Sequence, residues 1–210
     1  MALLHQATVT PTKLELLGAW LPGRPWSGAT GDLAGVWVQL GTFRFDDPAG
    51  EVGVETLLLR SGDGAVLQVP LTYRAAPLPG AERHLVGTAR HSVLGPRWVY
   101  DGCGDPVWVT TLLTAVLTGG TEAELMIDTP GGPVPRDRAT TVRGSGTPGT
   151  AVPAVGAVSC HDEGPVTVVR SGDAVIHVAR VVGSEVPGGA TLTGRWDGGA
   201  PVVLAGVRAG

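Results

Sequence analysis

The chain has 210 residues, of which 43% are apolar and only 5% aromatic, and its formal net charge is −4. This apolar content predicts a folded chain with a real core, while 33 glycines and 17 prolines predict many turns. Because the net charge is negative and the arginines are dispersed, nucleic acid and anionic membranes are poor partners.

A short helix is predicted close to the N-terminus, followed by strands. Thr12 and Glu15 have the spacing of a capping box, leucines follow at helical spacing, and Pro22-Gly23 ends the helix. Alternating apolar runs then predict strands over residues 36–45, 52–59, 65–73 and 85–89. Turn residues at 46–50 and 61–64 separate them, which favours an antiparallel meander.

A second helix is predicted over residues 107–117. Asp105 is a typical N-cap, Pro106 suits the first turn, and Gly119-Gly120 ends the run. Since the run is apolar nearly all round, we expect it to be buried between two layers.

The rest of the chain is predicted to be loop and then strands. Residues 129–153 are rich in Gly, Pro, Thr and Arg, which indicates a loop. Short valine-rich strands are expected at 154–160, 166–170, 174–182, 190–196 and 202–207.

These elements together predict an α+β fold in three parts. Residues 1–104 form an antiparallel sheet with a short N-terminal helix, residues 105–120 form a linking helix, and residues 121–210 form a second small antiparallel β subdomain.

Several motifs resemble those of one protein family. Residues 20–26 read WLPGRPW, with Trp20 and Trp26 framing Arg24; residues 67–73, 87–95 and 98–101 follow, and Asp105-Pro106 opens the second helix. This order, over about residues 14–117, resembles the N-terminal cap domain of actinobacterial maltokinases and related aminosugar kinases.

The resemblance also carries an expectation about activity. In maltokinases the cap precedes an intermediate subdomain of the kinase N-lobe and then a helical C-lobe with the chemistry. Residues 121–210 resemble a remnant of that N-lobe, with His177 at the place of the ATP-phosphate lysine. A neutral imidazole cannot replace an ammonium group there, and no C-lobe is recognisable, so we expect a stand-alone, non-catalytic protein.

Two weaker motifs each have a structural alternative. Gly144, Gly146 and Gly149 match a dinucleotide-binding loop, but Pro148 argues against the helix that such a loop opens, which leaves a flexible loop as the alternative.

Cys160 and His161, with Cys103, are candidate metal ligands. They lack the paired spacing of a structural zinc site, and a small buried cysteine beside a polar turn is the alternative.

The strongest surface candidate is the set of Trp20, Arg24 and Trp26. Two tryptophans beside an arginine suit a sugar or a protein partner. The alternative is that both rings fasten the first helix to the sheet while Arg24 pairs with a carboxylate.

The expected function is binding or regulation in α-glucan, maltose or trehalose metabolism. The expected partner is an enzyme of that metabolism or a kinase, with no cofactor. One alternative is a sugar kinase-like component completed by another chain, and another is a small carbohydrate-binding module. With two cysteines, no signal peptide and no apolar run of membrane-spanning length, the expected location is the cytoplasm.

Overall fold

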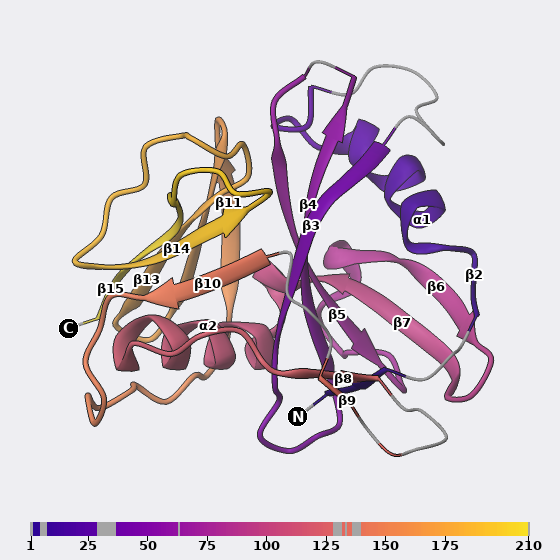
Figure 1. The fold of residues 1–210 in the computed structure, drawn as a ribbon, viewed down its shortest axis with the longest axis horizontal. Coiled ribbons are helices and arrows are strands. Elements are labelled where there is room, and N and C mark those ends of the chain that lie inside the picture. Colours follow the sequence, from indigo (N-terminus) through magenta and orange to yellow (C-terminus); the bar gives the residue numbers. More distant parts are fainter. Residues whose placement is uncertain are drawn as a thin grey trace.

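The fold is built mainly from antiparallel β-sheets. The computed structural model describes residues 2–4, 8–28, 37–62, 64–127, 132, 134–135 and 140–209. In these residues two six-stranded sheets lie side by side, with two α-helices and a small three-stranded sheet (Figure 1). The predicted antiparallel sheets and two helices are confirmed, but strands dominate, so the fold is mainly β rather than evenly α+β. No helix among the described residues is long and apolar enough to cross a membrane.

The first sheet has the strand order β2-β6-β7-β5-β4-β3, and every neighbouring pair is antiparallel. Its strands are β2 (Val9–Thr10), β3 (Trp37–Phe45), β4 (Gly53–Ser61), β5 (Leu67–Arg74), β6 (Leu85–His91) and β7 (Gly95–Asp101). The sequence did not predict β7 as a strand, because Gly95-Pro96 is a turn signal; Pro96 in fact lies near the start of the strand, opposite Arg90. Val36 and Asp63, within predicted elements, lie outside the described residues.

Helix α1 (Lys13–Trp20) covers one face of the first sheet. The predicted capping box is present: the Thr12 hydroxyl accepts from Glu15 N at 3.3 Å, and Thr12 N donates to Glu15 Oε2 at 2.7 Å. A 3₁₀ turn, η1 (Leu21–Gly23), then ends the helix at the predicted place. The apolar cluster under α1 contains Leu17, Trp20, Leu21, Trp26, Trp37, Leu57, Leu59, Leu67, Val69, Leu71 and Val99.

The second sheet has the order β10-β14-β15-β13-β12-β11 and is also antiparallel throughout. Its strands are β10 (Thr140–Gly144), β11 (Ser159–Glu163), β12 (Val166–Ser171), β13 (Ala174–Ala179), β14 (Ala190–Trp196) and β15 (Val202–Arg208). The predicted loop over 129–153 was therefore wrong at β10, whose buried and exposed residues alternate despite a Thr- and Gly-rich sequence. Residues 129–131, 133 and 136–139 of that loop lie outside the described residues. The strand predicted at 154–160 begins only at Ser159.

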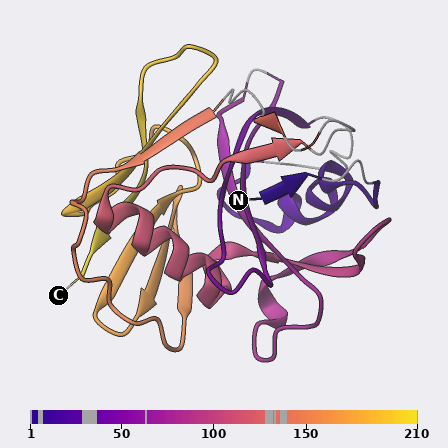
Figure 2. The same ribbon diagram turned by 60° about the horizontal axis from the view of Figure 1, so that its bottom comes forward.

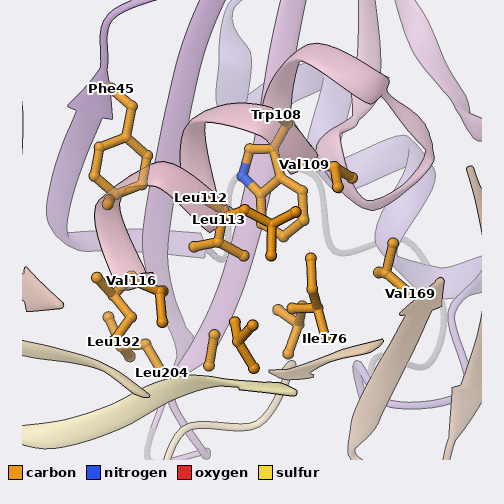
Figure 3. Packing of buried hydrophobic residues seen from close by; sticks show 14 of the residues in the cluster. Phe45, Trp108, Val109, Leu112, Leu113, Val116, Val169, Ile176, Leu192 and Leu204 are labelled. Atoms are coloured by element: carbon orange, nitrogen blue, oxygen red, sulfur yellow. The ribbon is translucent and has the colours of Figure 1, made fainter. Parts of the chain in front are cut away.

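Helix α2 (Pro106–Thr118) lies between the two sheets, as predicted. Its buried side chains pack toward Phe45 of the first sheet and toward Ile176, Leu192 and Leu204 of the second (Figure 3). These side chains include Trp108, Val109, Leu112, Leu113 and Val116. The Asp105 carboxylate caps its start by accepting from Val107 N at 2.9 Å. Figure 2 shows α2 running along the second sheet.

Short elements complete the fold. Two further 3₁₀ turns, η2 (Glu82–His84) and η3 (Gly102–Gly104), flank β6 and β7. The small sheet pairs β1 (Ala2–Leu4) in parallel with β8 (Leu125–Ile127), and β8 pairs with β9 (Val134–Pro135).

The two large sheets are also joined through their backbones. Gln68 N donates to Arg180 O, and Val182 N donates to Val66 O, both at 2.8 Å. The Gln68 side chain adds a hydrogen bond of 3.1 Å to Leu204 O. The division into parts at residues 104 and 120 stays a prediction, and these bonds cross it.

Candidate binding site between the two sheets

The predicted residues Trp20, Arg24 and Trp26 do lie together. Trp20 ends α1, and the η1 turn reverses the chain so that the Trp26 ring meets the Trp20 ring edge-on, with 5.9 Å between centroids. The Arg24 guanidinium lies over Trp20, its Cζ atom 4.9 Å from the ring centroid. Both rings are buried, with 9% and 5% of their surface exposed, whereas Arg24 is half-buried.

Arg180, which follows β13, extends this group into the second sheet. Its Cζ atom lies 4.7 Å from the Trp26 ring centroid, and the residue is 1% exposed. Nη2 donates to Asp101 Oδ2 at 2.5 Å, and Nε donates to Thr167 Oγ1 at 2.7 Å. Burial alone would lower the pKa of Arg180, but the Asp101 carboxylate raises it above its usual value, so the guanidinium stays charged. We call Trp20, Arg24, Trp26, Arg180 and Asp101 the arginine–tryptophan cluster.

Sequence reasoning missed Arg180 and Asp101 as members of this cluster. Arg180 interrupts the apolar run predicted as a strand over 174–182, and a charged residue inside such a run needs a buried partner. That signal was available in the sequence. The partner was not, because Asp101 is 79 residues away along the chain.

The rings' burial fits the packing alternative for Trp20 and Trp26. One part of that alternative does not hold among the residues that the structure describes, because Arg24 has no carboxylate partner there. A binding role for these three residues stays a prediction, and it depends on Arg24 and on the free ring nitrogen of Trp26 rather than on an exposed ring face.

Of the three candidate metal ligands, Cys160 and His161 face opposite sides of β11, and Cys103 is buried in the η3 turn. Cys160 Sγ lies 3.9 Å from His84 Nδ1 on the inner side, while the exposed His161 places Nε2 2.8 Å from Glu163 Oε1. Neighbouring residues of a strand alternate in direction, so Cys160 and His161 do not converge on one ion. Burial raises the pKa of Cys160 to about 11, which keeps the thiol protonated at neutral pH. The described residues contain no group of three or more metal-ligating side chains.

The glycine pattern at 144–149 closes the C-terminus of α2. Gly144 N donates to Gly120 O, Gly146 N donates to Val116 O and Thr147 N donates to Leu117 O, at 2.9, 2.9 and 3.0 Å. These N–H groups face the carbonyl end of a helix, which carries negative partial charge, the opposite of a phosphate site. The dinucleotide-loop interpretation is not supported by this geometry. Two of the bonds join the loop to the last turn of α2, and the third joins it to Gly120 just after the helix.

Glycine is needed at Gly146 for close approach. A Cβ atom there would lie 2.0 Å from Leu117 O, a backbone atom that cannot move without breaking the helix end. We expect Gly146→Ala to lower the free energy of unfolding by about 1–3 kcal/mol, the usual cost of overpacking.

Urea denaturation would measure the Gly146→Ala effect. Gly156→Ala is the matched control, since no atom of the described residues lies within 4 Å of a Cβ atom at that glycine. Equal stability of the two variants would contradict the proposed role of Gly146.

His177 lies on β13, apart from the glycine loop. It pairs with Val168 and Gly206, and the strands β15 and β14 separate it from Ser145, at strand spacings of about 4.8 Å each. Burial lowers the pKa of His177, and the charge of Arg208 lowers it further. The imidazole is therefore neutral at pH 7, and the structure does not bring it together with Gly144, Gly146 or Gly149.

The chain is thus a mainly β protein in which two antiparallel sheets enclose a buried helix, and the buried Arg180–Asp101 pair links residues of the two sheets. Residues 20–105 match the family model described as the maltokinase N-terminal cap domain. The match confirms the resemblance inferred from the sequence for this segment, which runs from Trp20 of the cluster to the N-cap of α2. No curated protein matches the chain.

Proposed function

We propose that this protein is a non-catalytic cap-domain protein that acts by binding, in α-glucan, maltose or trehalose metabolism. The match of residues 20–105 to the maltokinase cap domain supports this metabolic context. The partner in this proposal is an enzyme of that metabolism or a kinase polypeptide, and residues 121–210 are a remnant of a kinase N-lobe.

The glycine loop is the observation that carries the non-catalytic part of the proposal. In a nucleotide site the loop's N–H groups would be free to bind phosphate, but here they are bonded to Val116 O and Leu117 O. The neutral His177 supports the same conclusion, because transfer of a phosphoryl group needs a positive charge on the phosphates.

The main alternative is a sugar kinase-like component completed by another chain. It is retained because the β12–β13 hairpin, with Val168 opposite His177, has the strand pairing of the hairpin that carries the phosphate lysine in such kinases. The carbohydrate-binding module has less support, since the rings of Trp20 and Trp26 are buried.

Calorimetric titration with Mg-ATP separates these functions. We expect no binding heat for the unchanged protein and none for His177→Ala. Saturable heat that disappears in His177→Ala would overturn the non-catalytic proposal and favour the kinase component. A change in tryptophan fluorescence on titration with maltose, trehalose or glycogen would instead favour the carbohydrate-binding module.

The partner is tested by affinity capture from the source cell with the intact chain as bait. We expect recovery of an enzyme that acts on α-glucan, maltose or trehalose, or of a kinase, and then direct binding of that purified enzyme. Direct assays in which none of these enzymes binds would contradict the proposed partner.

A further inference from the structure

The arginine–tryptophan cluster holds hydrogen-bond donors that have no acceptor. Seven buried side-chain N or O atoms lack a partner among the described residues, and three of them belong to this one cluster: Arg24 Nε, Trp26 Nε1 and Arg180 Nη1. Leaving a buried donor unpaired destabilises the folded state, and a charged donor more than a neutral one. Three such donors, in residues that contact one another directly or through Trp20, therefore point to an acceptor outside the described residues.

The three donors belong to one continuous arrangement. Arg24 stacks on Trp20, Trp20 meets Trp26 edge-on, and Arg180 stacks on Trp26. Burial lowers the pKa of the neighbouring His84, and the charges of Arg180 and Arg24 lower it further, so both guanidinium groups act on the same imidazole. Arg24 is the half-buried member, and the cluster reaches the surface there.

The local charge selects the kind of acceptor. Asp101 neutralises Arg180, and Asp162 adds a second negative charge near it. Arg24 has no ion pair within the described part of the chain, and Arg83 adds a third positive charge next to His84, so positive charge is in excess. Guanidinium and indole N–H groups only donate, so a cation or another donor is excluded. A negatively charged group with several acceptor oxygens fits both the donors and the excess charge.

We propose that the cluster binds one small tetrahedral oxyanion, a phosphate group, through Arg24 Nε, Trp26 Nε1 and Arg180 Nη1. This site is separate from the glycine loop and from His177, and it does not depend on the proposed function. The phosphate is either the free inorganic ion or the end group of a small phosphate monoester.

The test is a thermal-stability titration of the full chain, read together with tryptophan fluorescence. Inorganic phosphate and methyl phosphate are the probes, and sodium chloride at matched ionic strength is the reference. We expect a saturable rise in Tm with phosphate, because a ligand that binds only the folded state stabilises it. We also expect a fluorescence change at the same concentrations, because Trp26 supplies a donor.

Arg24→Gln is the main variant, since Arg24 is half-buried and has no ion pair among the described residues. Loss of a charged donor weakens binding by about tenfold or more. Trp26→Phe keeps the ring contact with Arg180 but removes the donor, and should also weaken binding. Arg90→Gln, on the exposed side of β6, is the matched control and should bind like the unchanged protein.

Each outcome decides the proposal. Equal binding of both probes supports a monoester end group, and binding of inorganic phosphate alone supports the free ion. A response to phosphate no larger than that to chloride, or an equal response in Arg24→Gln, would overturn the proposal, with internal water as the acceptor for the buried donors.

Discussion

Replacing Arg180 with methionine is expected to lower the free energy of unfolding by about 3–5 kcal/mol. The guanidinium is the partner of Asp101 at 2.5 Å, and both residues are buried. Methionine fills similar space but leaves the Asp101 carboxylate without its countercharge, and it removes the hydrogen bond to Thr167. Chemical denaturation at neutral pH measures the loss.

Two variants distinguish the loss of charge pairing from the loss of volume. Arg170→Met changes an exposed arginine on β12 and should shift stability by no more than about 0.5 kcal/mol. In the double variant Arg180→Met, Asp101→Asn, the unpaired charge is gone, so part of the lost stability should return. A double variant as unstable as the sum of the two single variants would contradict this account.

Replacing Trp108 with alanine is expected to cost about 3–5 kcal/mol, the range for deleting a large buried aromatic side chain. Trp108 is 2% exposed and lies on α2 in the core between the sheets, where Figure 3 shows it beside Leu112 and Val109. Its removal leaves a cavity that touches both sheets, so a single cooperative unfolding transition at lower denaturant concentration is expected.

The control variants for Trp108 separate cavity formation from loss of the indole nitrogen. Trp108 Nε1 is buried and has no partner among the described residues, so we expect Trp108→Phe to lose no hydrogen bond and to cost much less than Trp108→Ala. Val93→Ala, at a residue 58% exposed on the β6–β7 turn, should be nearly neutral. Two separate unfolding transitions in Trp108→Ala would show that the sheets do not share this core.

Much of the fold could be predicted because the signals are local. Thr12 and Glu15 form the capping box of α1, and Asp105 and Gly119 cap the two ends of α2. Each of these signals lies within a few residues of the helix end that it sets, and the structure confirms them. The strand β10 was missed because its partner residues in β14 lie about 50 residues further along the chain, and Thr140–Gly144 has no apolar run of its own. A local sequence pattern does not predict pairing between strands that are far apart in the sequence.

The candidate site was predictable in part. Trp20, Arg24 and Trp26 are close in sequence, so their grouping could be inferred, but their burial depends on the sheet below them and on Arg180. The glycines at 144–149 suggested a dinucleotide-binding loop for a related reason. Glycine is favoured where the backbone closely approaches a phosphate, and equally where it closely approaches the C-terminus of a helix. Only the position of α2 distinguishes the two.

The backbone bonds between residues 66–68 and residues 180–182 make the first sheet depend on the second part of the chain. A chain that kept only residues 20–105 would leave Val66 O and Gln68 N without their partners at Val182 and Arg180. It would also uncover Phe43, Phe45 and Leu58, whose covering layer comes from α2 and the second sheet. We therefore expect that residues 20–105 of this protein do not fold on their own. Fused to another protein, they would need that protein to supply an apolar layer and backbone hydrogen-bond partners.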